Sequence, residues 1–103
     1  MTKKADKLLC VIYKDYLARI KQGQSMSDAN RFTTDYFATE TSSVSKNIDD
    51  IIQLKSELKK ADLLKVSVSG NANLTPYGIE YMENRFKNGL AEVLDFLSKF
   101  LPY

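Results

Sequence analysis

The residue types that carry most enzyme chemistry are scarce in this chain. Histidine is absent, which removes the commonest general base and the commonest metal ligand. The single cysteine, Cys10, has no base among its neighbours, and a cysteine between Leu9 and Val11 behaves as a small hydrophobic residue. Five acidic residues lack the spacing of a metal-binding loop: Asp28, Asp35, Glu40, Asp49 and Asp50. We therefore expect a protein that binds a macromolecule, with no enzymatic activity and no cofactor.

Basic side chains are concentrated near the amino end. The net charge of the 103 residues is +2, while residues 1–22 hold six basic and two acidic side chains, a local balance of +4. A basic end favours nucleic acid, although it is equally typical of a solvated helix face. The first residues lack the pattern of a signal peptide, and no stretch approaches the roughly 20 apolar residues of a membrane span. Together with the single cysteine, these features predict a cytoplasmic protein.

The first sixty residues have the pattern of helices. Apolar residues at helical spacing predict a long helix over about residues 3–21, which Gly23 ends. A short helix is expected within residues 27–37, before a loop rich in serine and threonine. A third helix, capped by Ser43 or Ser45, runs to about Lys60. Its predicted buried side consists of Val44, Ile48, Ile51, Ile52, Leu54 and Leu58.

The apolar spacing then changes from helical to alternating. Leu64, Val66 and Val68 alternate with polar residues and would lie on one face of a strand. Gly70-Asn71 is a two-residue turn of the kind that hairpins favour, and residues 72–74 can return as a second strand. The sequence thus predicts a β-hairpin after the helices.

Two more helices are expected after the hairpin. Thr75 is a good helix cap, and Pro76 at the first helical position loses no needed hydrogen bond. Asn88-Gly89 interrupts the chain before a last amphipathic helix over about residues 90–100. The expected fold class is mainly α with a small β-hairpin, in a single domain over residues 1–103.

The order of these elements, a helical trio followed by a hairpin, is that of a winged helix-turn-helix domain. The run Leu74-Thr75-Pro76-Tyr77-Gly78-Ile79-Glu80-Tyr81-Met82 resembles the Leu-Thr-x-x-Gly-x-x-Tyr-Leu/Met run by which many small bacterial winged-helix proteins leave the wing. The chain is similar to the YjcQ-like winged-helix proteins of Gram-positive bacteria and their phages, over about residues 3–86. The resemblance implies a winged helix-turn-helix with an extra C-terminal helix.

The resemblance also implies a DNA-binding transcriptional regulator related to a phage or mobile element. The helix at about residues 43–60 would enter the major groove, and the hairpin tip would follow the phosphate backbone. Asparagine and lysine are suited to base edges and phosphates. The implied contacts to double-stranded DNA are Ser45, Lys46, Asn47, Asp50, Lys55, Lys59, Lys60, Lys65 and Asn71.

Other residues depart from what strong DNA binding requires. Asp49 and Asp50 would repel phosphates, the outward face of the helix has no arginine, and Lys65 is the only charge of the wing. Any DNA binding should therefore be weak and sensitive to salt. The alternative is a winged-helix protein-interaction module without DNA binding.

The last helix has a wider apolar stripe than a terminal helix needs. Residues 88–103 either close the monomer core against the first helix or pair with a second copy, and we favour a homodimer because closed two-fold pairing is common. The expected dimer interface consists of Leu90, Val93, Leu94, Leu97, Phe100 and Leu101.

Overall fold

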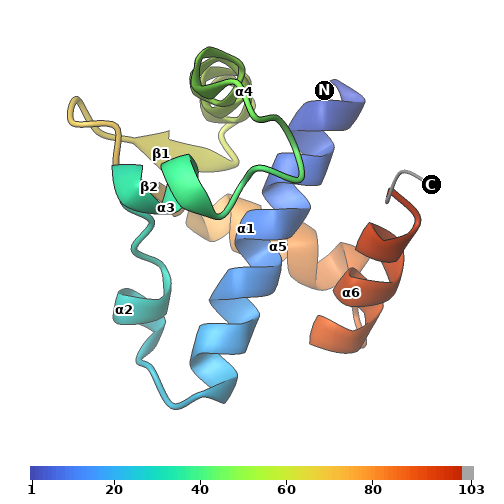
Figure 1. Ribbon diagram of the computed structural model, residues 1–103. Helices are drawn as coiled ribbons and strands as arrows, with labels where there is room; N and C mark the ends of the chain where they lie inside the picture. Colours follow the sequence, from blue (N-terminus) through green and yellow to red (C-terminus); the bar gives the residue numbers. More distant parts are fainter. Residues whose placement is uncertain (101–103) are drawn as a thin grey trace.

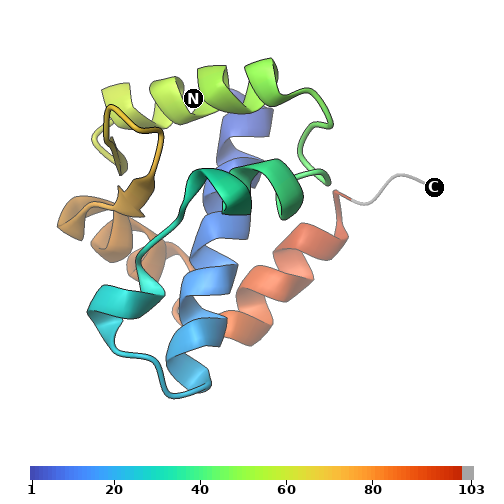
Figure 2. The same cartoon turned by 60° about the vertical axis from the view of Figure 1, so that its left-hand side comes forward.

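The computed structural model describes residues 1–100, in which six helices and one small hairpin form a mainly α structure (Figure 1). The long helix α1 (Lys3–Lys21) occupies the centre of both views (Figures 1 and 2). Thr2 caps α1 because its side chain accepts a hydrogen bond from the Ala5 N–H. The short helices α2 (Met26–Ala29) and α3 (Thr34–Thr39) follow, and α4 (Ile48–Lys60) lies across the amino end of α1.

The core forms around α1, whose apolar residues at helical spacing are buried. Leu8, Leu9 and Ile12 are fully covered, as the periodicity of this segment predicts. Helices α3 and α4 contribute Phe37, Ile51, Leu54 and Leu58 to the same core. Among residues 1–100, no helix is both long and apolar enough to cross a membrane.

The hairpin pairs β1 (Leu64–Val66) with β2 (Ala72–Leu74) in antiparallel register, with Leu64 opposite Leu74. The predicted hairpin is confirmed, but two of its details are wrong. Strand β1 ends at Val66 and strand β2 begins at Ala72, so the connection is longer than a two-residue turn. Val68 lies in that connection and is fully exposed, because the chain leaves the ladder after Val66.

Extended backbone before α3 pairs with the other edge of the hairpin. Phe32 and Ala72 exchange both backbone hydrogen bonds, at 3.0 and 2.8 Å. The Asn30 side-chain amide continues this pairing, since it donates to the Leu74 carbonyl and accepts from the Leu74 N–H. The hairpin is thus held against the helices by a third extended segment, which the sequence did not predict.

The run from Leu74 to Met82 has a structural explanation at α5 (Pro76–Arg85). The Thr75 hydroxyl accepts from the Gly78 N–H and donates to the Asp62 carbonyl, at 2.8 and 2.6 Å. A Cβ atom on Gly78 would lie 2.3 Å from the Leu63 carbonyl oxygen. Glycine is therefore needed for α5 to approach the start of the hairpin. The expected cap at Thr75 and the proline at the first position are confirmed.

Helix α6 (Leu90–Ser98) packs against α1 of the same chain (Figure 2). Val93, expected at a dimer interface, is fully buried in the monomer and offers no exposed surface to a second copy in this arrangement. Leu90, Leu97 and Phe100 are half-buried, whereas Leu94 is 48% exposed. Leu101 lies outside the described residues. The helix closes the core in cis, and a homodimer stays a prediction.

We expect Gly78→Ala to lower the free energy of unfolding by about 2 kcal/mol, because the added methyl group must displace backbone. Alanine otherwise favours a helix over glycine, so an unchanged or raised stability would contradict the packing described. Urea denaturation monitored by circular dichroism measures the difference. Glu80→Ala, an exposed change on the same helix, is the control and should alter stability by less than about 0.5 kcal/mol.

Candidate interaction surface between α4 and the hairpin

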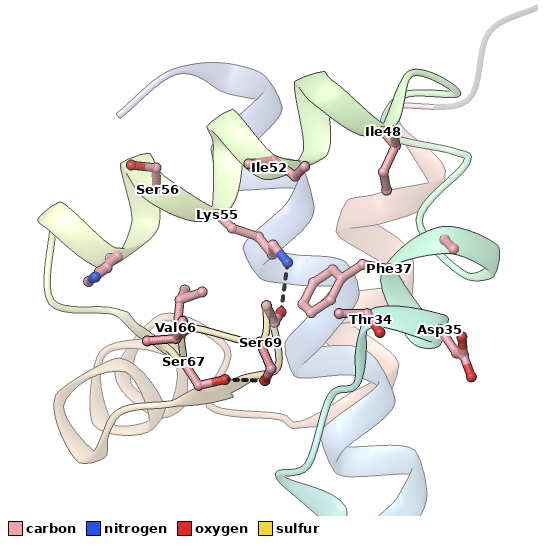
Figure 3. A pocket seen from close by; sticks show the side chains of 14 residues that line it. Thr34, Asp35, Phe37, Ile48, Ile52, Lys55, Ser56, Val66, Ser67 and Ser69 are labelled. Carbon is pink, nitrogen blue, oxygen red and sulfur yellow. Dashed lines mark hydrogen bonds between the residues drawn. The ribbon is translucent and has the colours of Figure 1, made fainter.

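A groove of about 710 Å³ separates α4 from the loop of the hairpin and reaches α3 (Figure 3). We call it the α4–hairpin groove. Its lining residues are Thr34, Asp35, Phe37, Ala38, Ile48, Ile52, Lys55, Ser56, Lys59 and residues 66–70. The groove lies on the face that the resemblance assigns to DNA, so its chemistry bears directly on function.

The groove exposes apolar side chains from both walls. Ile48 and Ile52 are 47% and 55% exposed, and Val68 faces them from the hairpin loop without cover. The expectation that Ile48 and Ile52 belong to the buried side of the helix is wrong. Ile51, Leu54 and Leu58 contact the core. Ile48 and Ile52 lie on the adjacent strip of the helix surface, which faces the groove.

Lys55 lies inside this surface. Its side chain is only 5% exposed, and its Nζ donates to the Gly70 carbonyl oxygen at 2.8 Å (Figure 3). The ammonium also lies 4.2 Å from the centre of the Phe37 ring, a favourable cation–π distance. Burial lowers the pKa of Lys55. Lys55 therefore joins α4 to α3 and the hairpin, and its ammonium, expected to contact DNA phosphates, has partners within the chain.

The polar residues at the start of α4 form hydrogen bonds with one another and with the backbone, which cap the helix. Asn47, not Ser43 or Ser45, is the helix cap, and its Oδ1 accepts from the Asp49 N–H at 2.9 Å. The Ser45 hydroxyl donates to Asp50 Oδ2 at 3.0 Å and accepts from the Asn47 N–H. Three of the expected base contacts, Ser45, Asn47 and Asp50, thus already have hydrogen-bond partners within the chain.

The hairpin tip is also held by a hydrogen bond within the chain. Asn71 Oδ1 accepts from the Thr34 N–H at 3.1 Å, and so ties the loop to the start of α3. Asn71 was expected to contact DNA, but its side-chain oxygen has a structural partner. Within residues 1–100, the expected DNA contacts whose side chains have no hydrogen bond to another residue are therefore all lysines.

Those remaining residues are Lys46, Lys59, Lys60 and Lys65, all of them exposed. No ion pair within 4 Å involves any of the four among the described residues. The amino end lies close by, because the Thr2 N–H and hydroxyl both donate to the Glu57 carboxylate on α4, at 2.6 and 3.1 Å. The basic amino end and α4 are therefore brought together, through the acidic residue Glu57.

The apolar residues that the groove exposes were expected elsewhere. Ile48 and Ile52 were assigned to the buried side of the helix, and Val66 and Val68 to one strand face. Two signals were present in the sequence. The apolar stripe of the α4 segment is wider than one core contact needs, and the alternation continues to Val68 beyond the last paired residue.

Metal-binding groups and the cysteine of the described part of the chain can be assessed directly. Within residues 1–100, no three acidic, cysteine or histidine side chains are grouped to hold a metal ion. Cys10 is fully buried in α1, and burial, reinforced by the negative charge of Asp6, raises the pKa of its thiol to about 12.

Comparisons with known protein families, with curated proteins and with solved structures found no match for this chain. Its function must therefore be argued from its own geometry.

We expect Cys10 to react with DTNB at pH 8 at least about 100-fold more slowly in the native protein than in guanidinium chloride, since reaction requires local opening. The high pKa keeps the thiol protonated at this pH, which adds to the protection. The absorbance of the released thiolate measures both rates. Similar rates in the two conditions would show that α1 does not bury Cys10 in solution.

Proposed function

We propose that this chain is a protein-interaction module of winged-helix type, which binds an apolar segment of a partner protein in the α4–hairpin groove. The observation that carries the proposal is the exposure of Ile48, Ile52 and Val68 on facing walls of one hollow. Exposed apolar residues that are gathered at one place mark interaction sites, whereas scattered ones need no explanation.

The order of the elements supports the winged-helix part of the proposal. Helices α1, α3 and α4 precede the hairpin, and the Phe32 segment pairs with β2 on the edge away from β1. In this arrangement α4 takes the place of the recognition helix and residues 67–71 take the place of the wing tip.

The same arrangement gives less support to DNA. Affinity for DNA depends on cations that neutralise phosphates. The exposed face of α4 presents Asp49, Gln53 and Ser56, while Lys55 is turned inward. An apolar partner fits this face better than a phosphate backbone does.

A DNA-binding regulator is the second candidate. The observation that favours it is the set of exposed lysines without ion pairs, Lys46, Lys59, Lys60 and Lys65, beside the basic amino end. Binding of this kind would use few phosphates and would be strongly reduced by salt.

To test the proposal, a phage-displayed library of random short peptides is selected on the wild-type protein. We expect selected peptides whose affinity falls at least about tenfold for Ile52→Asp, because a buried charge replaces an apolar contact. Leu94→Asp is the matched control, since Leu94 is similarly exposed on α6. The proposal fails if no peptide is enriched, or if the peptides bind Ile52→Asp and wild type equally well.

For the second candidate, we expect mixed-sequence duplex DNA to bind with a dissociation constant weaker than about 10⁻⁴ M at 200 mM salt. Fluorescence anisotropy of a labelled duplex measures this, together with a titration at about 50 mM salt. Micromolar binding that Lys59→Gln and Lys60→Gln both weaken would favour the regulator over the interaction module.

A further inference from the structure

Two lysines face the α4–hairpin groove from successive turns of α4. Lys55 lies at its floor and Lys59 at its exposed rim, and both line the same hollow. Among residues 1–100, neither lysine lies within 4 Å of a carboxylate. Like charges four residues apart on a helix also repel each other. Because no carboxylate pairs with either lysine there, positive charge remains beside the apolar walls.

The rest of the lining offsets only part of this charge. Asp35 is the only acidic residue among the lining residues. The other polar groups of the lining are hydroxyls, and those of Ser67 and Ser69 bond to each other at 2.8 Å. The Lys55 ammonium has three N–H donors; within the described residues the Gly70 carbonyl occupies one, and the Phe37 ring lies 4.2 Å away.

We infer that the segment bound in this groove carries an aspartate or glutamate among its apolar side chains. The inference rests on the proposed function, and it specifies the chemistry of the partner. Apolar side chains of the segment would cover Ile48, Ile52 and Val66, while the carboxylate approaches Lys59 and then the charge of Lys55. Removal of water by the apolar contacts strengthens such an ion pair, because the local dielectric constant falls.

The exposed rim makes Lys59 the residue to change. Lys59→Gln keeps a flexible polar side chain, one atom shorter, and removes its charge. Lys60 is also exposed and follows Lys59 on the same helix, but it does not line the groove, so Lys60→Gln is the matched control. Lys55 is less suitable for a first test, since its hydrogen bond to Gly70 also holds the hairpin.

The peptides selected on the wild-type protein provide the test. We expect those that lose affinity for Ile52→Asp to contain aspartate or glutamate more often than the unselected library does. Lys59→Gln should weaken their binding about threefold to fivefold at low salt, and Lys60→Gln by less than about twofold. Replacement of the peptide carboxylate by its amide should remove the difference between wild type and Lys59→Gln.

The outcomes separate this inference from the proposed function. Peptides that depend on Ile52 but lack acidic enrichment, or that bind Lys59→Gln as well as wild type, would overturn the inference and leave the interaction module standing. A selection without any peptide that depends on Ile52 would overturn both.

Discussion

The pairing of Phe32 with Ala72 is the constraint on which the arrangement of the two walls depends. It fixes the hairpin at the point where the chain turns into α3, and Asn30 and Asn71 extend the contact on both sides. Gly70 completes this joint, because it has a φ of +96° and a Cβ there would lie 2.9 Å from the Thr34 methyl group. The hairpin loop is thereby held beside α3 and does not cover Ile48 and Ile52 on α4.

The groove follows from that placement. The loop reaches α4 through the bond between Lys55 and Gly70, and it leaves Ile48 and Ile52 without cover. Lys55 can lie there because its aliphatic stem packs among apolar residues and its ammonium faces the Phe37 ring. A single inward lysine thus joins the two walls at the floor of the groove, and the exposed isoleucines provide its apolar surface.

Much of the fold could be predicted from the sequence because the signals were local. The spacing of Leu8, Leu9 and Ile12 indicated a buried helix, and Thr75-Pro76 marked a helix start that the structure confirms. The end of strand β1 at Val66 was not predicted, since alternation continues to Val68 whether or not a partner strand is present. Pairing between residues 30–34 and 71–74 depends on contacts distant in sequence, which periodicity does not report.

The site was harder to predict for the same reason. Helical periodicity indicates an apolar stripe but not which part of it meets a neighbour, so Ile48 and Ile52 were assigned to the core. Residue type alone made Lys55 a surface cation and Asn47 a base contact, whereas one is buried and the other caps the helix. The most direct test of the account is to map backbone amide chemical shifts while a selected peptide is added to the labelled protein. The account predicts the largest shifts at residues 48–59 and 66–70, and largest shifts on α5 or α6 would contradict it.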